Sequence, residues 1–467
     1  MDILLIGHDY KYAAEQMLLT LYPAERPVYP SEPPQGERVE LALEDGMARC
    51  TLVTAQGAFQ GEAAVEPYAT ALEQNRQEQR AVKLAFYRAA LASGHERPVW
   101  GALTGVKPGK LMARYLSEGK TAADFARDFD VSPTRTAICE TTTRATLAAR
   151  DSLAAGDVCL YVGIPFCPTR CAYCSFIASA VGTNLKLMEP YLAALRREIA
   201  LAAQKVRAAG LRPVALYMGG GTPTTLSAGQ LDALCETLAA EFDLSALREY
   251  TIEAGRPDTI TAEKLRVMKR HGVTRVSVNP QTMSDEVLAA IGRFHTAQDI
   301  LDALALVRAE GGFEVNMDLI AGLPGDSALG FSRTLDSVLA LAPENITVHT
   351  LSIKNGSYLA QRPETLPAAA EVASMLDEAA QRLDAAGYAP YYLYRQKYMS
   401  GGFENLGWAR RGTENLYNIC MMEELCDVIA LGAGGSSKFP APDGSIRRQV
   451  NPKYPKEYIE RIGQSGL

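Results

Sequence analysis

The sequence predicts an α/β protein built on an open, partial (β/α)6 barrel, a TIM-like arrangement with an α/β module before it and an α+β cap after it. Between about residues 153 and 355, six short apolar runs alternate with helical stretches. This alternation is typical of parallel strands joined by right-handed crossovers, and six units are too few for a closed eight-fold barrel. Three cysteines directly follow the first predicted strand, where barrel loops carry chemistry.

Composition limits the classes of protein to which this chain can belong. The chain has 467 residues, of which 47% are apolar and 22% charged, enough for two or three ordinary globular domains. A net charge of −7 argues against nucleic acid as a partner, and nine cysteines, three of them clustered, suit a reducing compartment. We find no signal peptide and no stretch long enough to span a membrane. We therefore expect a cytoplasmic protein.

The N-terminal module, residues 1–152, shows mixed patterns followed by a helical tail. We expect a strand at Ile3–Ile6, a helix at Tyr10–Leu21, a hairpin of Val39–Leu43 and Ala48–Thr54, a helix at Glu66–Leu91, a glycine-rich loop at Trp100–Gly109 and helical structure to about Leu153. The hairpin is indicated by the Glu44-Asp45-Gly46 turn between two alternating runs.

The barrel, residues 153–355, and the cap, residues 356–467, follow. The expected barrel strands are Val158–Val162, Val214–Met218, Tyr250–Glu253, Arg275–Val278, Glu314–Leu319 and Ile346–Leu351, with helices near 187–209, 227–241, 261–271, 284–309 and 328–341. In the cap we expect a helix at Ala368–Ala386 and an aromatic strand at Tyr388–Arg395, with a glycine-rich run at Leu431–Lys438.

The cysteines Cys167, Cys171 and Cys174 form a C-x3-C-x2-C loop. Three thiolates ligate three irons of a [4Fe–4S] cluster, which leaves the fourth iron open to chelate a small molecule. The alternatives are a zinc knuckle or three buried structural thiols, and structural zinc needs four ligands. Cys159, the nearest other cysteine, lies in a predicted strand, and no histidine is close by in the sequence.

Polar and glycine residues also mark the ends of the later strands. Met218 to Pro223 holds three consecutive glycines, which let a backbone approach a ligand closely. Glu253, Gln281, Arg293 and Asp318 come at or after the third, fourth and fifth strands, and we expect them at one rim. His349, at the end of the sixth strand, is either an acid–base group there or a buried structural histidine.

Together these segments resemble the radical S-adenosylmethionine (radical SAM) superfamily and, within it, the oxygen-independent coproporphyrinogen III oxidase family. The matching segments are Tyr161–Cys167, Gly219–Pro223, the Glu253 strand, Gln281, Ile291–Thr296 and Asp318–Pro324. The HemZ branch of that family is the most similar, through Trp100–Lys110, Asn279–Gln281 and Gly432–Lys438. The resemblance covers about residues 95 to 440.

The resemblance implies two cofactors, one [4Fe–4S] cluster per chain and S-adenosyl-L-methionine. It implies that Cys167, Cys171 and Cys174 are the metal ligands, and that the cofactor-binding residues are Tyr161, Tyr173, Gly220, Gly221, Thr222, Glu253, Gln281, Arg293, Asp318 and Ile320. The implied activity is that of a coproporphyrinogen dehydrogenase, which decarboxylates two propionates to vinyl groups in porphyrin biosynthesis. No catalytic side chain beyond the cluster and the cofactor is implied, and a second cofactor molecule is left open.

Substrate and partners follow from the same implied reaction. A tetracarboxylate tetrapyrrole needs cations, and Arg395, Lys397 and Lys438 in the cap are candidates, together with Arg410 and Arg411. We expect an electron donor such as flavodoxin or ferredoxin, and we expect a monomer.

Two further hypotheses come from positions at which this chain departs from the oxidase pattern. Phe176 replaces a further cysteine and Gly163 replaces a histidine, and a Phe-type residue at the first of these positions resembles the haem-chaperone branch, HemW. That branch carries a His-Asn-x-x-Tyr haem-binding motif, where this chain reads Glu414-Asn415-Leu416-Tyr417. The second hypothesis is thus haem trafficking, and the third is a radical methyltransferase or ring-opening enzyme acting on a tetrapyrrole.

A further pair of cysteines lies in the cap. Cys420 and Cys426 are six residues apart on a helical pattern, so that they would not share a helix face. We therefore expect no additional cluster there.

Overall fold

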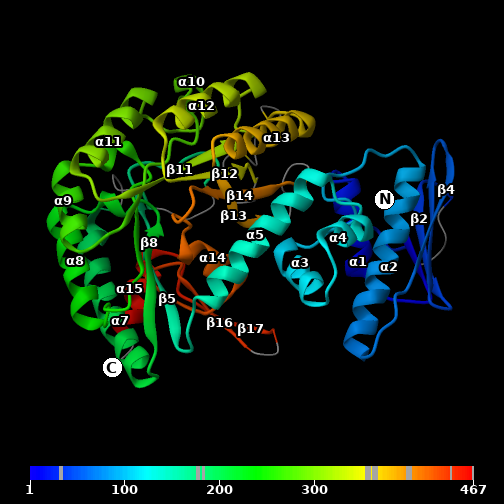
Figure 1. Cartoon of the computed structure of the whole chain (residues 1–467), viewed down its shortest axis with the longest axis horizontal. Helices are drawn as coiled ribbons and strands as arrows, with labels where there is room; N and C mark the ends of the chain where they lie inside the picture. The colour runs from blue at the N-terminus through cyan, green and yellow to red at the C-terminus, as the bar shows by residue number, and fades with distance from the viewer. Residues whose placement is uncertain are drawn as a thin grey trace. The chain divides into compact units, whose positions relative to one another are not determined.

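The computed structural model describes residues 1–30, 35–174, 179–180, 185–352, 359, 366–395, 402–441 and 444–464. The chain divides into two compact units (Figure 1). The first comprises Met1–Glu140 and Arg395–Phe403, and the second comprises Thr141–Tyr394 and Glu404–Leu467. The residues from Glu404 onward thus belong to the same unit as the barrel.

The first unit contains a four-stranded sheet covered by two helices. The strands β1 (Asp2–Ile6), β2 (Arg38–Glu44), β3 (Met47–Thr54) and β4 (Gly57–Ala64) lie in that order, with α1 (Lys11–Leu21) and α2 (Ala71–Ala92) contributing to one apolar core. The predicted hairpin is β2–β3, and its turn residues Asp45 and Gly46 both have positive φ, at 49° and 72°. Two positive φ values are what a type I′ hairpin turn requires. The sequence analysis missed β4, whose glycine-containing run lacks a strand-like apolar alternation.

Helices follow the sheet in this unit. Helix α2 begins after Thr70 rather than at Glu66, because the Thr70 hydroxyl and the Glu73 carboxylate form a capping box. The helical tail is three helices, α3 (Pro108–Ser117), α4 (Ala122–Phe129) and α5 (Pro133–Asp151), and α5 continues beyond Glu140 into the second unit. Asp130 ends α4 in the left-handed conformation, at φ 55°.

The second unit is built on the six predicted parallel strands. They are β5 (Asp157–Ile164), β8 (Arg212–Gly220), β9 (Glu249–Glu253), β10 (Arg275–Ser277), β11 (Glu314–Ala321) and β12 (Asn345–Thr350), and they are neighbours in this order. Every pairing between them is parallel. The predicted (β/α)6 arrangement is therefore confirmed.

The crossover helices are α7 (Met188–Ala208), α8 (Ala228–Glu241), α9 (Ala262–Arg270), α10 (Asp285–Ala290), α11 (Ala297–Glu310) and α12 (Ala328–Leu341), drawn from green to yellow along one side of the sheet in Figure 1. The single helix expected at 284–309 is wrong, because Gly292 turns to φ 76° and ends α10. A capping box between Thr296 and Asp299 then starts α11. Arg293 and His295 therefore lie between the two helices and belong to neither.

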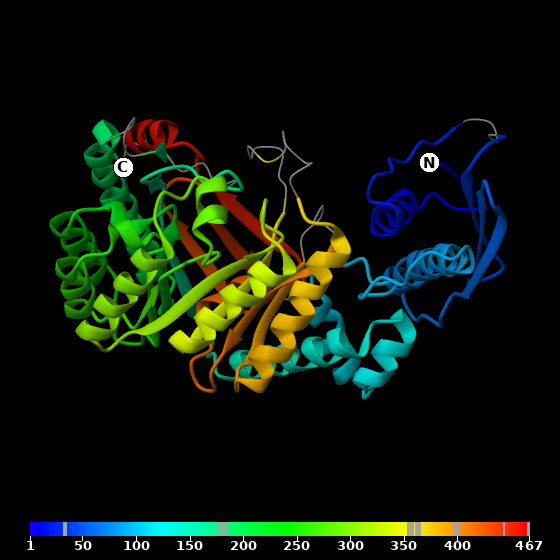
Figure 2. The same cartoon turned by 90° about the horizontal axis from the view of Figure 1, so that it is seen from above.

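The C-terminal elements extend the same sheet at both edges. Beyond β12 lie β14 (Glu404–Ala409) and β13 (Ala389–Arg395), and beyond β5 lie β15 (Asp427–Leu431), β16 (Ser436–Pro440) and β17 (Ile446–Val450). Helix α13 (Ala369–Ala385) runs beside α12, as Figure 2 shows in orange and yellow. Two further helices are α14 (Leu416–Glu423) and α15 (Pro455–Gln464).

Helix α14 closes the end of the barrel at which the parallel strands begin. The Glu249 carboxylate, at the start of β9, accepts the backbone N–H groups of Leu416 at 2.8 Å and Tyr417 at 3.2 Å. Tyr417 then stacks on Tyr217 inside the sheet, with ring centroids 4.5 Å apart. Among the described residues, no helix is both long enough and apolar enough to cross a membrane.

Candidate functional site

The cysteine loop leaves the carboxyl end of β5, as predicted. Cys167 lies in the short strand β6 (Phe166–Cys167), which pairs with β7 (Ser179–Ala180), while Cys171 and Cys174 lie on the turn that follows. The Ala172 N–H donates to the Ile291 carbonyl at 2.9 Å, so the loop is attached to the segment that breaks α10 from α11. Burial raises the pKa of the Cys167 thiol to about 11. A metal would replace that proton, because thiolates are the ligands of iron.

Arg256, which follows β9, holds the same loop in place. It is not among the residues predicted from the sequence. Its side chain is 3% exposed, and its Nη1 donates to Thr169 Oγ1 at 2.8 Å. The same guanidinium forms an ion pair with Asp258 at 3.1 Å. An arginine three residues past the end of a barrel strand was the available signal. The short turn after β9 is η3 (Pro257–Thr259).

The glycine run after β8 forms a close-packed cradle beside Cys167. The Gly221 N–H donates to the Ile164 carbonyl at 2.8 Å, and the Thr222 N–H donates to the Phe166 carbonyl at 2.7 Å. A Cβ at Gly221 would lie only 2.5 Å from the Phe166 carbonyl oxygen. The Thr222 hydroxyl lies 3.4 Å from Cys167 Sγ. Backbone can approach a ligand here because no side chain intervenes.

Glu253 stands beside this cradle at the end of β9. The Tyr217 hydroxyl donates to Glu253 Oε1 at 2.5 Å, and a Cβ at Gly219 would lie 2.8 Å from the same carboxylate. Burial raises the pKa of Glu253 to about 7, and the negative charge of Asp318 acts in the same direction. The carboxylate is therefore poised to exchange a proton near neutral pH.

Gln281, Asp318 and Ile320 meet where β10 and β11 end. The Gln281 N–H donates to the Asp318 carbonyl at 2.8 Å, and the Ile320 N–H donates to the Gln281 carbonyl at 3.0 Å. Gln281 has φ 68°, an unusual conformation for a residue with a side chain. Its Oε1 is buried, with no hydrogen-bond partner among the described residues. A buried acceptor without a partner is an expected feature of a site that awaits a ligand.

Arg293 and His295 lie under the cysteine loop. Arg293 is buried, donates from Nη1 to the Asn279 carbonyl at 2.5 Å, and lies close to Cys171 and Tyr173. His295 is 4% exposed, and burial lowers its pKa to about 4, with Arg293 and Arg256 acting in the same direction. Neither His295 ring nitrogen has a hydrogen-bond partner within the described part of the chain. Between them, Phe294 is 79% exposed. The sequence analysis assigned no role to His295 or Phe294.

The two tyrosines of the predicted site lie on different sides of it. Tyr161 on β5 stacks with Tyr217 and Tyr417, and its hydroxyl would lie 3.0 Å from a Cβ placed at Gly220. Tyr173 lies within the cysteine loop, near Arg293. Burial raises the pKa of both phenols, so both stay protonated at neutral pH.

The site therefore joins three thiols, a side-chain-free cradle and unsatisfied buried acceptors at the carboxyl ends of neighbouring strands. Thiols in this loop suit iron, and the cradle and acceptors suit a ligand with amine and hydroxyl donors. Residues 161–338 match the family model of the radical SAM superfamily, which is the class of protein that this fold and this site define.

Comparison with individual proteins narrows that class. The chain is 39% identical over 373 residues to the oxygen-independent coproporphyrinogen-III oxidase-like protein HemZ of Bacillus subtilis, covering 78% of this chain and 74% of that protein. It is 29% identical to the haem chaperone HemW of Escherichia coli, over 64% of this chain and 75% of that one. The solved structure of the E. coli coproporphyrinogen III oxidase HemN, described as a radical SAM enzyme, matches with a TM-score of 0.56 and 25% identity, over 69% of this chain and 73% of that chain.

The chain belongs to the oxygen-independent coproporphyrinogen III oxidase-like family of radical SAM proteins. Its cofactors are those of the superfamily, a [4Fe–4S] cluster and S-adenosylmethionine. The fit of the residues described above agrees with both.

Among the predicted substrate cations that the structure describes, Lys438 lies away from this site and Arg395 belongs to the other unit. Arg395 belongs to the first unit, where its buried guanidinium donates to the Leu103 carbonyl at 2.6 Å and packs over Trp100. Lys438 pairs with Val428 at the start of β15, the opposite end of the sheet from the cysteine loop, and donates to the Met421 carbonyl at 2.9 Å. A role for Lys438 at the barrel mouth is therefore wrong, since parallel strands begin at one edge and end at the other. Lys397 and Phe176 lie outside the described residues.

The structure also places the remaining candidate residues. His349 Nε2 lies 4.0 Å from Asp318 Oδ1. His349 therefore lies at the rim, where the acid–base interpretation places it. Arg410 lies over the Tyr388 ring and Arg411 is exposed. Asn415 caps α14 by accepting the Asn418 N–H at 2.7 Å.

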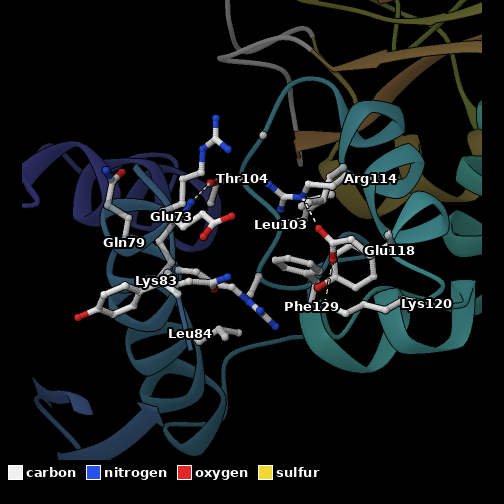
Figure 3. A pocket seen from close by; sticks show the side chains of 18 of the residues that line it. Glu73, Gln79, Lys83, Leu84, Leu103, Thr104, Arg114, Glu118, Lys120 and Phe129 are labelled. Carbon is white, nitrogen blue, oxygen red and sulfur yellow. Dashed lines mark hydrogen bonds and ion pairs between the residues drawn. The ribbon is translucent and has the colours of Figure 1, made fainter. Parts of the chain in front are cut away.

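A separate cavity lies in the first unit (Figure 3). Its volume is about 780 Å³, and it is lined by residues of α2 and of the segment from Ala102 to Phe129. Several of its cations are already paired, as Lys120 is with Glu118 at 3.1 Å. Lys83 donates to Thr104 Oγ1 at 3.3 Å, and burial lowers its pKa. None of the strand-end residues described above lines this cavity.

Proposed function

We propose that this protein is an oxygen-independent coproporphyrinogen III dehydrogenase that produces protoporphyrinogen IX. The observation that carries the proposal is the likeness to B. subtilis HemZ over most of the chain. The strand-end site supports it, because the residues needed to hold a cluster and a sulfonium cofactor lie together. The same proposal places the protein in the cytoplasm, as a monomer supplied with electrons by a flavodoxin or ferredoxin.

In this proposal, Cys167, Cys171 and Cys174 hold three irons of the cluster. The three thiolates would leave the cluster able to take S-adenosylmethionine as a further ligand. The backbone of Gly220, Gly221 and Thr222, where the two glycines carry no side chain, would receive the methionine part of the cofactor, and Glu253 would accept hydrogen bonds from the ribose hydroxyls.

The remaining residues orient the cofactor and shield it. Gln281 Oε1 and the Ile320 backbone face the adenosine part, with Asp318 beside them, and the Arg293 cation lies against the cysteine loop. The Tyr161 and Tyr173 side chains fill the space around the cluster and exclude water. The phenols stay protonated there, because burial raises the pKa of each.

Bound together, the reduced cluster and S-adenosylmethionine supply a carbon-centred radical able to take a hydrogen atom from an unactivated carbon. In the proposed reaction, one hydrogen atom leaves the β-carbon of a propionate. The Cα–carboxylate bond then breaks, CO2 departs, and one electron passes to an acceptor, which leaves a vinyl group. The sequence repeats at the second propionate.

Phe294 offers a surface for the macrocycle. Its ring is 79% exposed, and its chain neighbours Arg293 and His295 are buried. Flat apolar rings stack on aromatic side chains, and a tetrapyrrole is such a ring system. Substrate contact through Phe294 would not depend on the cap cations.

The test is an anaerobic assay of reconstituted protein with reductant, S-adenosylmethionine and coproporphyrinogen III. The proposal predicts protoporphyrinogen IX and CO2, with methionine and 5′-deoxyadenosine formed in proportion. Cofactor cleavage without decarboxylation would leave the superfamily assignment standing and remove this substrate.

Haem trafficking is the second candidate, favoured by the similarity to HemW. The local geometry weighs against it. Asn415 is used as a helix cap, Tyr417 is stacked inside the barrel, and Glu414 accepts the Gly412 N–H at 3.1 Å. A haem titration separates the two candidates, since the trafficking hypothesis requires a shift of the Soret band on addition of the protein.

A further inference from the structure

Three cysteines outside the cluster loop meet at the base of the barrel. Cys159 lies on β5, Cys420 lies on α14, and Cys426 lies between α14 and β15. Their three sulfur atoms all lie within 4.8 Å of one another, and the sulfurs of Cys159 and Cys426 are 3.7 Å apart. All three are free thiols. On one continuous helix, Cys420 and Cys426 would not share a face.

The end of α14 explains how Cys420 and Cys426 come together. Helix α14 stops at Glu423, and Glu424 adopts φ 59°, a left-handed conformation that reverses the chain. The Glu424 N–H donates to the Cys420 carbonyl at 2.8 Å, and the Leu425 N–H donates to the same carbonyl at 3.3 Å. Cys426 therefore returns beside Cys420 on its way into β15. Strand β15 is the parallel neighbour of β5, with Val428 opposite Cys159, which completes the group.

This group is separate from the radical SAM site. Cys159 is the third residue of β5, whereas the cysteine loop follows Ile164 at the far end of that strand. Five strand residues span about 16 Å. The two cysteine groups consequently occupy opposite ends of the sheet.

The spacing suits a thiophilic metal ion. Zinc–sulfur bonds are about 2.3 Å long, so two sulfurs at tetrahedral positions on one ion lie about 3.8 Å apart. The 3.7 Å between the sulfurs of Cys159 and Cys426 agrees with that value.

The residues around the three cysteines favour an ion of a particular charge. The neighbours include Val214, Leu416 and Val428, which are apolar and buried. Net charge in such surroundings is unfavourable. Three thiolates around Zn²⁺ leave a charge of −1, whereas three thiolates around Cu⁺ leave −2. The divalent ion is therefore the better match.

We propose that Cys159, Cys420 and Cys426 bind one Zn²⁺ ion and thereby tie α14 and β15 to the first strand of the barrel. Zinc prefers four ligands, so a water completes the set. Cys426 is the partly exposed member of the three, and solvent reaches the ion from its side. The metal replaces thiol protons and causes no redox change.

Metal content of the full-length protein tests this proposal. After anaerobic reconstitution of the cluster and incubation with zinc, wild-type protein should contain one zinc per chain in addition to its iron. Cys159→Ser, Cys420→Ser and Cys426→Ser should each lower bound zinc at least tenfold and leave iron unchanged. Cys235→Ser is the matched control, because Cys235 is an equally buried thiol that lies beside Tyr250 instead.

A second measurement needs no variant. Cobalt added to the wild-type protein should give the visible bands of a tetrahedral thiolate site and should protect these three cysteines from alkylation, as read by mass spectrometry. The proposal is overturned if zinc stays bound in Cys420→Ser, or if wild-type protein with these thiols reduced binds neither zinc nor cobalt. Iron content and cofactor cleavage report separately on the cluster loop.

Discussion

The Tyr217 hydroxyl donates to the Glu253 carboxylate at 2.5 Å, joining β8 to β9 where the proposed cofactor site begins. This bond lowers the pKa of Glu253, but burial and the nearby Asp318 outweigh it and raise that pKa to about 7. The carboxyl group thus carries a proton near neutral pH that it would lose in the unfolded chain.

Glu253 should make stability depend on pH with a definite sign. Between about pH 5 and 7, the folded protein holds a proton that the unfolded chain has released, so the free energy of unfolding falls as pH rises through this window. Glu253→Gln should remove that fall and stabilise cofactor-free, cluster-loaded protein at about pH 8 by on the order of 1–3 kcal/mol. Urea unfolding at several pH values measures it.

The same group should act oppositely on the cofactor. Because only the ionised carboxylate accepts from both ribose hydroxyls, binding of S-adenosylmethionine should tighten as pH rises past about 7. Tyr217→Phe removes a bond that favours ionisation, and it should move this transition to higher pH. An affinity that is flat with pH in the wild-type protein would contradict the assignment of Glu253.

Gly221→Ala should disrupt the cradle. The added Cβ would lie 2.5 Å from the Phe166 carbonyl oxygen and 2.8 Å from that of Ile164, both backbone atoms. The loops must separate, at about 1–3 kcal/mol of stability, and S-adenosylmethionine should bind at least tenfold more weakly. Gly229→Ala is the control, since nothing lies within 4 Å of its Cβ position. Equal affinities in the two variants, measured by equilibrium dialysis, would argue against the cradle.

Arg256→Lys should loosen the cysteine loop. The lysine cannot bond Thr169 and Asp258 together as the guanidinium does. We expect faster loss of iron in air, by a few-fold or more. Thr169→Val removes the acceptor of the same bond, so the double variant should be little worse than Arg256→Lys alone. Additive effects of the two changes on the rate of iron loss would show that this bond does not hold the loop.

Phe294→Ala should affect the substrate and spare the cofactors. Its ring is exposed, so truncation should leave folding, iron content and S-adenosylmethionine affinity unchanged while raising the KM for coproporphyrinogen III by about tenfold, as expected for one lost stacking contact. Leu329→Ala, another exposed apolar residue, serves as the control. An unchanged KM in the Phe294 variant would exclude this contact.

The sequence predicted the barrel because its signal is local. Each strand is an apolar run with a loop at its end, and chain order sets the order of β5 to β12 in the sheet. Glu253 and Asp318 could be placed at the rim for the same reason, since parallel strands end at one edge.

The missed features depend on contacts between distant segments. The bond from Arg256 to Thr169 joins residues 87 positions apart, so the strand-end position of Arg256 is visible in the sequence but its partner is not. The meeting of Cys159 with Cys426 depends on a single left-handed residue, Glu424, that ends α14 early. Lys438 was misplaced because the antiparallel turn from β15 to β16 returns it to the base of the sheet.

The most direct test of the central claim follows a single hydrogen atom. Coproporphyrinogen III carrying deuterium at the propionate β-carbons is incubated with the reduced, cluster-loaded protein and S-adenosylmethionine, and 5′-deoxyadenosine is analysed by mass spectrometry. We predict that the wild-type protein forms the vinyl product and transfers deuterium to 5′-deoxyadenosine. The Cys171→Ala variant should do neither. Unlabelled 5′-deoxyadenosine with the macrocycle recovered intact would contradict it.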